Sequence, residues 1–241
     1  MKPLIAAIQF LTILPIGRKG TYAPDRMLPF FPLVGLLIGS LLCFFDWMAA
    51  QFWPLPTVTI LDTVFLVLVT GGLHLDGVGD TADGLYGGAG DRVKALAIMK
   101  DSCAGAIGVV AVICVMAVKT AGILSLDSHR MLLLLIVPAY ARGATLFGFA
   151  FLPYGRPEGG TGHDFFDKKI TPSVFWALLI PAALSFGLGW GWLLINICFF
   201  ALIGIILMFY RKRLGCITGD MLGAMTEVIE ALLFLIGGMN L

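Results

Sequence analysis

Long apolar stretches, separated by short polar ones, recur along most of the 241-residue chain. A helix needs about 20 apolar residues to cross the hydrocarbon core of a bilayer. On this criterion the sequence predicts seven spanning helices, at residues 29–49, 57–75, 105–124, 131–152, 173–188, 191–209 and 221–238. The fifth and sixth are parts of one apolar run, which we divide at Gly187, Gly189 and Gly191. Seven spans would place the two termini on opposite sides of the membrane.

An apolar run at residues 4–14 precedes these spans and is too short to cross a membrane. No small-residue cleavage site follows it, because the next residues are Gly17-Arg18-Lys19-Gly20. We therefore predict an interfacial N-terminal helix. The expected fold is an all-α, polytopic integral membrane helical bundle, with about seven transmembrane helices plus the interfacial helix, in a single domain over residues 1–241.

The composition supports this fold class. Hydrophobic residues make up 59% of the chain and charged residues 13%, with a mean hydropathy of +0.96, whereas soluble domains contain about 25% charged residues. A separate soluble domain is therefore excluded, and the net charge of +1 gives no indication of nucleic-acid binding. The five cysteines form no CxxC pair, which argues against a disulfide framework or a zinc site.

The basic residues are distributed unequally between the two sides of the predicted bundle. Most of the 16 Lys and Arg residues fall in the N-terminal segment and in the loops at 76–104, 153–172 and 210–219, which share one side. The opposite side carries Arg130 alone. By the positive-inside rule, the three loops should face the cytoplasm. We expect a multi-pass membrane protein with its polar chemistry on the cytoplasmic side.

The most informative polar motif, HLDGVGDTADG, occupies residues 74–84 of the first of these loops. Asp76, Asp80 and Asp83 stand at i, i+4 and i+7, so on a helix they share one face within roughly 40°. Crowded carboxylates repel each other unless a cation neutralises them, and their oxygens suit Mg²⁺ or Mn²⁺. The alternative is a solvated acidic loop, because three glycines disfavour a helix here, Gly77, Gly79 and Gly84.

Other polar residues near this motif are open to two interpretations each. Asp101 is either a further carboxylate of the site or part of the cap of the next span at Ser102. Lys100 suits phosphate binding, but it also fits the positive-inside pattern. His74 is either a general base or an orienting hydrogen-bond partner. Arg156 lies in a glycine-rich loop at 153–162, whose backbone N–H groups and guanidinium could bind an anion.

Several charged residues fall within the predicted spans. Arg142 should face the bundle interior and meet a carboxylate or a phosphate, because an unpaired cation at that depth is unfavourable. An acidic stripe on the seventh span offers partners, at Asp220, Glu227 and Glu230. This arrangement is either a buried ion pair that holds the bundle together or part of a catalytic site. We expect Lys119 to snorkel outward, and Asp46 and Asp62 to be interfacial.

Three sequence blocks resemble a known family. HLDGVGDTADG is followed by IMKDSCAGAIGVVAV and, near the end, by TGDMLGAMTEVIEALL, and together they resemble the cobalamin 5′-phosphate synthase (adenosylcobinamide-GDP ribazoletransferase) family. LTILPIG near the start and the YGRPEGG loop resemble the same family, so the likeness covers nearly the whole chain. One departure is Lys100, which stands where the family pattern has arginine, and which keeps the charge without the bidentate fork. Another is Cys103-Ala104, in place of a basic and apolar pair.

The resemblance implies a membrane-embedded transferase and the last joining step of cobalamin biosynthesis. Adenosylcobinamide-GDP would react with α-ribazole or its 5′-phosphate, giving adenosylcobalamin or its 5′-phosphate and GMP. A mechanism that fits has Mg²⁺, or Mn²⁺, on Asp76, Asp80 and Asp83, and a carboxylate such as Asp83 or Asp101, or else His74, as the base. The candidate substrate-binding residues are Lys100, Arg142, Arg156, Asp220 and Glu227. The expected partners are these small molecules and the lipid bilayer, and homo-oligomerisation is left open.

Three other functions fit parts of the sequence. A CDP-alcohol-type phosphotransferase would keep the metal site, but its usual Ala-Arg pair after the first Asp-Gly is replaced here by Gly79-Asp80. A cation-coupled transporter could use Arg142, Glu227 and Glu230, but it predicts polar groups along a path to the outside, where the chain offers few. A structural membrane subunit would leave the three aligned aspartates unexplained.

Overall fold

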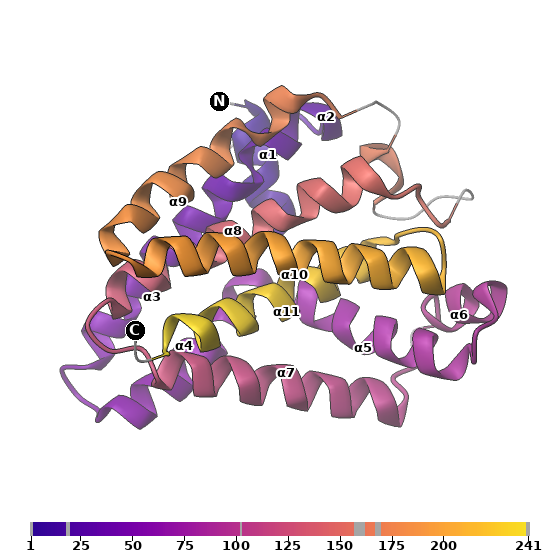
Figure 1. Cartoon of the computed structure of the whole chain (residues 1–241). Helices are drawn as coiled ribbons and strands as arrows, with labels where there is room; N and C mark the ends of the chain where they lie inside the picture. The colour runs from indigo at the N-terminus through magenta and orange to yellow at the C-terminus, as the bar shows by residue number, and fades with distance from the viewer. Residues whose placement is uncertain (1, 18–19, 102, 157–161, 167–169, 240–241) are drawn as a thin grey trace.

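The computed structural model describes residues 2–17, 20–101, 103–156, 162–166 and 170–239 (Figure 1). In these residues all regular elements are helical, which confirms the predicted all-α class. The α-helices are α1 (Lys2–Leu11), α2 (Pro24–Met27), α3 (Phe31–Ala49), α4 (Leu55–Thr70), α5 (Leu73–Gly87), α6 (Arg92–Ile98), α7 (Ala106–Leu124), α8 (Arg130–Phe151), α9 (Leu179–Leu184), α10 (Gly191–Arg213) and α11 (Gly219–Gly237). Four short 3₁₀ helices accompany them, η1 (Leu28–Phe30), η2 (His163–Phe165), η3 (Pro172–Leu178) and η4 (Ser185–Leu188).

The chain is a membrane protein, although the predicted count of seven spans is not confirmed. Within the described residues, four helical segments are long and apolar enough to cross a bilayer, Pro24–Ala49, α7, α8 and α10. A fifth span results if α4 and α5 are counted together. The predicted span at 173–188 corresponds to a shorter apolar segment, Pro172–Leu188, and α11 contains three acidic residues. The division of the long apolar run is confirmed, because η4 ends at Leu188 and α10 begins at Gly191.

The predicted span at 57–75 is broken. Gly71 and Gly72 have φ angles of 62° and 71°, in the left-handed region that favours glycine. They end α4 and start α5 in a new direction, 90° away. The backbone N–H of Ile13, just after α1, donates to the carbonyl of Val69 at 2.9 Å. The break therefore turns α5, which contains the acidic motif, alongside α7 and α11.

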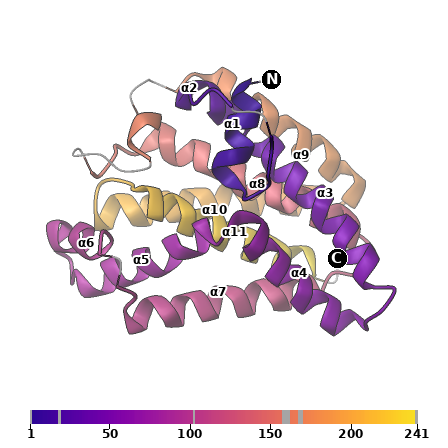
Figure 2. The same ribbon diagram turned by 180° about the vertical axis from the view of Figure 1, so that it is seen from behind.

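Helix α11 occupies the centre of the bundle and packs against α5, α7, α8 and α10 (Figures 1 and 2). Helices α3 and α8 also pack closely against each other, because Gly35 and Gly39 allow the two backbones to approach. Helix α1 buries one face, including Ala7 and Leu11. The fold thus surrounds α11 with other helices, and whatever polar residues α11 carries must find partners inside the protein.

Asp46 and Asp62, which were predicted near the ends of their spans, lie inside the protein. Both are buried, at 3% and 0% exposure. The Arg130 guanidinium binds them together, with Nη2 at 2.6 Å from Asp46 Oδ1 and 2.7 Å from Asp62 Oδ2. It also donates to the carbonyl of Ile123 at 2.7 Å. These contacts join α3, α4, α7 and α8 at one end of the bundle, so the carboxylates contribute to helix packing.

Candidate active site

The acidic motif forms a helix, α5, as its spacing predicts, and the solvated-loop alternative is wrong. Glycines in this helix allow α11 to approach it. A Cβ atom on Gly77 would lie 2.5 Å from the carbonyl oxygen of Asp220, and one on Gly223 would lie 3.2 Å from the Cα of His74. The small residues at the crossing therefore bring the start of α11 against the face of α5 that carries His74 and Gly77, with Asp220 within electrostatic range of Asp76.

This crossing leads to a testable prediction. Gly77→Ala should separate α5 from α11, lower the unfolding free energy by about 1–3 kcal/mol through overpacking, and reduce activity. Gly79→Ala is the matched control, because its Cβ would meet only Val112 Cγ2 at 3.8 Å, an ordinary contact. Thermal unfolding of the purified protein, with an activity measurement beside it, compares the two. Equal behaviour of the two variants would show that the close crossing does not position the site.

The carboxylates of this region carry more negative charge than nearby cations neutralise. Asp80 is half-buried and lies within electrostatic range of Asp76, Asp83, Asp220 and Arg156. Arg156 pairs with Asp220, Nη2 to Oδ2 at 2.6 Å. In the described part of the chain, no hydrogen bond or ion pair is made by the carboxylates of Asp76 and Asp80. Among the described residues, Arg156 is the one cation within electrostatic range of Asp80, against three further carboxylates, so an added cation would stabilise the cluster.

Arg156 reaches Asp220 because two loops pair through their backbones. The N–H of Gly155 donates to the carbonyl of Ile217 at 2.9 Å, and the N–H of Ile217 donates to the carbonyl of Pro153 at 3.0 Å. This short parallel bridge joins the loop after α8 to the loop before α11. The sequence shows the arginine but not this pairing, which depends on contact between segments about 60 residues apart.

Asp220 stands at the beginning of α11, which Thr218 caps by accepting a hydrogen bond from the N–H of Met221 at 3.2 Å. Burial raises the pKa of Asp220 above its ordinary value, and the Arg156 guanidinium opposes that shift. Burial likewise raises the pKa of Tyr154, on the same loop as Arg156. Arg156 thus favours the ionised form of Asp220 at the mouth of the site.

Asp83 has a structural partner that the sequence did not indicate. Its two carboxylate oxygens accept hydrogen bonds from the backbone N–H groups of Gly105, at 2.7 Å, and Gly108, at 2.8 Å. These groups belong to the start of α7, where N–H groups lack partners within the helix and favour negative charge. A Cβ atom on either glycine would overlap the carboxylate. The two glycines therefore leave room for the side chain that anchors α5 to α7.

Lys100 and Asp101 lie in the turn after α6, and both are exposed. Asp101 Oδ1 accepts a hydrogen bond from the N–H of Cys103 at 3.2 Å. Ser102, the predicted cap, lies outside the described residues. Among the described residues, no hydrogen bond or ion pair joins Lys100 or Asp101 to the aspartates of α5. The structure does not bring these two residues into the cluster.

A buried charge network lies deeper in the bundle. Lys119 Nζ is 2.5 Å from Glu227 Oε2 and 2.7 Å from Glu230 Oε1, and Arg142 Nη1 pairs with Glu230 Oε2. All four side chains are at most 5% exposed. The predicted pairing of Arg142 with the acidic stripe is confirmed at Glu230. The prediction that Lys119 snorkels outward is wrong, because two carboxylates hold it inside.

A cavity of about 220 Å³ opens beside the carboxylate cluster, between α1, α3, α5, α8 and α11. Its polar lining consists of His74, Asp76, Thr145 and Asp220. His74 is 5% exposed and lies within electrostatic range of Arg142, Glu227 and Lys119. The histidine therefore stands between the buried charge network and the cavity, and Asp76 and Asp220 connect the cavity with the carboxylate cluster.

Comparison with known proteins identifies the family of this chain. A family model described as cobalamin-5-phosphate synthase matches residues 3–238, nearly the whole chain. The chain belongs to the cobalamin-5-phosphate synthase family. It is therefore an enzyme, a transferase of cobalamin biosynthesis, and acts on small molecules.

Curated relatives agree with this membership. The chain is similar to adenosylcobinamide-GDP ribazoletransferase of Pseudomonas syringae pv. syringae (strain B728a), with 39% identity over 240 residues, 95% of this chain and 96% of the relative. It is 37% identical to the enzyme of that name from Acinetobacter baumannii (strain ACICU), over 97% of this chain and 95% of the relative. No solved structure matches the chain at a significant level. The description of the site therefore rests on the geometry of this chain and not on a related solved structure.

The carboxylates of α5 are the groups that could bind a metal ion in this cobalamin-5-phosphate synthase family member. In the described residues, no group of three or more His, Cys, Asp or Glu side chains forms a ready-made metal site. Magnesium commonly takes only one or two protein carboxylates and completes its shell with water and substrate phosphates. Asp76 and Asp80 supply two such carboxylates. Asp83 keeps lone pairs besides those used by the two amides, because a carboxylate has about four. The residues fit a magnesium ion that is completed by substrate.

Proposed function

We propose that this enzyme joins adenosylcobinamide-GDP to α-ribazole, or to its 5′-phosphate, and releases GMP. The product is adenosylcobalamin or its 5′-phosphate. A ribazole oxygen forms a bond to the phosphorus nearer the corrinoid, and the bond from that phosphorus to the oxygen bridging to GMP breaks. The observation that carries the proposal is the meeting of Asp76, Asp80 and Asp220 with Arg156 at the mouth of a cavity. The printed name of the relatives supports the choice of substrates.

We propose Mg²⁺ as the cofactor, with Mn²⁺ as the alternative, held by Asp76, Asp80 and Asp83. When bound, the ion would neutralise charge on the diphosphate and on the leaving GMP. The excess of carboxylates over cations around Asp80 supports this choice. The chain's own contribution is to fix these carboxylates, through the approach of α11 to Gly77 and the hold of the α7 amides on Asp83.

The remaining roles follow from position. We propose that Arg156 binds a phosphate oxygen, with its guanidinium held at the mouth by Asp220. Of the candidate bases, His74 lines the cavity, whereas Asp83 binds the α7 amides and Asp101 lies beyond α6. This placement favours His74 for receiving the proton of the attacking hydroxyl. Catalysis would rest mainly on positioning and charge stabilisation, without a covalent nucleophile.

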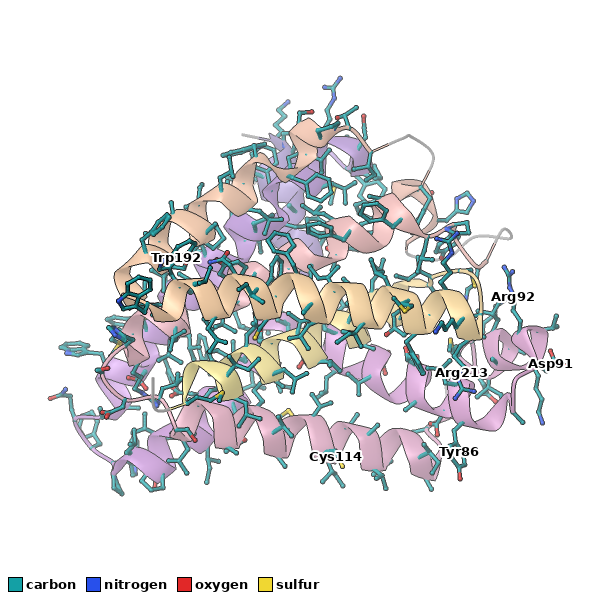
Figure 3. All side chains as sticks on the ribbon, viewed as in Figure 1. Tyr86, Asp91, Arg92, Cys114, Trp192 and Arg213 are labelled. Carbon is teal, nitrogen blue, oxygen red and sulfur yellow. The ribbon has the colours of Figure 1, made fainter. Side chains whose placement is uncertain are left out.

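The distribution of basic side chains supports a site that faces the cytoplasm in the bacterial inner membrane. Figure 3 shows Arg92 and Arg213 at the same end of the bundle as Tyr86 of α5, with Trp192 at the opposite end. The last turn of α10 adds Arg211 and Lys212. Under the positive-inside rule, the end that carries the acidic motif is the cytoplasmic one. Water-soluble nucleotide substrates would then reach it from the cytoplasm.

GMP release tests the proposal. Purified protein in lipid nanodiscs, given adenosylcobinamide-GDP, α-ribazole and Mg²⁺, should release GMP in equal amount to the corrinoid product. Omission of either substrate, or addition of a chelator, should stop the release. Transfer without the chelator effect would keep the reaction and contradict the metal. Absence of product from a folded protein with both substrates would contradict the proposed transfer.

A further inference from the structure

The cavity beside the carboxylates has an aromatic wall that the proposed chemistry does not explain. Four phenylalanines line it, each from a different element, namely Phe10, Phe31, Phe149 and Phe165. The ring of Phe165 touches the other three, at centroid distances of 5.2 Å to Phe10, 5.8 Å to Phe31 and 5.4 Å to Phe149. Helices α1 and α8 lie on one side of α5 and α11 in both opposite views (Figures 1 and 2). The wall is therefore assembled from distant segments around one small space.

One buried polar atom in the lining lacks a partner. The Nδ1 atom of His74 is buried and makes no hydrogen bond within the described part of the chain. A buried polar atom without a partner is unfavourable, so such an atom beside a cavity points to a ligand or a water molecule there. The ligand that fits this space is mostly apolar, planar enough to lie against phenyl rings, and able to make a hydrogen bond at the His74 end.

Apart from their sugars, the two substrates of the proposed reaction contain four ring systems, corrin, adenine, guanine and benzimidazole, and size and polarity separate them. A corrin macrocycle with its side chains is too large to be enclosed in a cavity of about 220 Å³. Guanine and the adenine of the adenosyl group are small enough, but both carry several donors and acceptors along their edges. The polar side chains of the lining could pair with some of these groups, and the rest would face phenylalanine rings. The benzimidazole of α-ribazole is uncharged, planar and apolar except for one free ring nitrogen. It is the ring system that the lining suits.

We propose that this cavity binds the aromatic base of the acceptor nucleoside, stacked on the cluster around Phe165, with His74 Nδ1 hydrogen-bonded to the nucleoside. The inference rests on the proposed function, because it takes the acceptor from that reaction. Bound in this way, the ribose would extend toward Asp76 and Asp220, which line the same cavity and belong to the carboxylate cluster. The cavity would then decide which lower base the enzyme accepts, and polar bases would be poor substrates.

Direct binding of α-ribazole, measured by calorimetry without the corrinoid substrate, tests the assignment. Phe165→Leu should weaken α-ribazole binding about tenfold, since it removes the ring that contacts the other three. Binding of GMP to the same variant should change less than about twofold. Phe151→Leu is the matched control, because Phe151 is 65% exposed on the last turn of α8 and should change neither affinity. Phe10→Leu, in a half-buried position on α1, repeats the test should the first variant unfold.

The outcomes separate the two proposals. Unchanged α-ribazole affinity in folded Phe165→Leu and Phe10→Leu would overturn the cavity assignment, whether or not the wild type releases GMP. Weakened GMP binding with unchanged α-ribazole binding would overturn it too, and would assign the cavity to guanine. Phenylalanine-dependent α-ribazole binding by a wild type that releases no GMP would support the cavity assignment and contradict the proposed transfer.

Discussion

Asp80→Asn is expected to lower the rate of GMP release by about a hundredfold to a thousandfold while leaving the fold intact. The expected size is that of losing one group that stabilises transition-state charge. Asp80 stands among three like charges, Asp76, Asp83 and Asp220. Removing its charge reduces repulsion in the metal-free protein, so the unfolding temperature should stay the same or rise. A loss of activity without a loss of stability would identify Asp80 as a site residue.

A second readout for this variant does not depend on turnover. A ligand that binds only the native state raises the unfolding temperature, so Mg²⁺ should stabilise the wild type and have a smaller effect on Asp80→Asn. Asp127→Asn, an exposed aspartate between α7 and α8 at the far end, is the control and should behave as the wild type. Near-normal GMP release by Asp80→Asn, with an undiminished effect of Mg²⁺, would refute the assignment of Asp80 to the metal.

Glu230→Gln is expected to destabilise the protein by about 3–5 kcal/mol, the usual cost of breaking a buried ion pair by removing one partner. Glu230 binds both Lys119 and Arg142 in the interior. Its loss leaves two cations with only Glu227, and therefore an uncompensated positive charge. Thermal unfolding in detergent measures the effect, and Lys94→Met, at an exposed position of α6, is the control that should change stability by less than about 0.5 kcal/mol.

A charge-neutral double variant tests whether electrostatic balance is the cause. Glu230→Gln combined with Lys119→Met leaves one cation, Arg142, and one carboxylate, Glu227. The double variant should be less destabilised than the sum of its parts, with a coupling energy of about 0.5–3 kcal/mol. Strict additivity would show that the four side chains do not act as one network. A raised KM for either substrate in a stable variant would instead favour the catalytic interpretation of Arg142.

The sequence predicted the helical class and the helical acidic motif because both depend on local patterns. Apolar runs of membrane-spanning length specify helices wherever they occur, since the backbone must satisfy its own hydrogen bonds in lipid. The i, i+4, i+7 spacing of the aspartates specifies one helix face in the same local way. The division of the long apolar run before Gly191 could also be predicted from its glycines. One of them, Gly189, has a positive φ angle in the structure.

The sequence predicted only some of the ion pairs inside the bundle. Arg142 had to meet an anion, and the acidic stripe on the last helix was its predicted partner, as the pair with Glu230 shows. Lys119, by contrast, was expected to reach outward because a lysine can do so on an isolated helix. Packed against α11, the same lysine meets two carboxylates instead. Asp46 and Asp62 had no predicted partner for the same reason, because Arg130 comes from a helix that is distant in sequence.

By itself, then, the sequence determined the all-α membrane class, the helical face of aspartates and the family to which the chain belongs. The tertiary structure alone decided that the second span breaks at Gly71 and Gly72, that Asp83 anchors α7, and that Arg156 meets Asp220. It alone assembled four phenylalanines from separate elements into one wall. Periodicity and composition are local properties, whereas a contact between distant segments depends on how helices cross. At this site, glycines such as Gly77 set that crossing through the close approach that they allow.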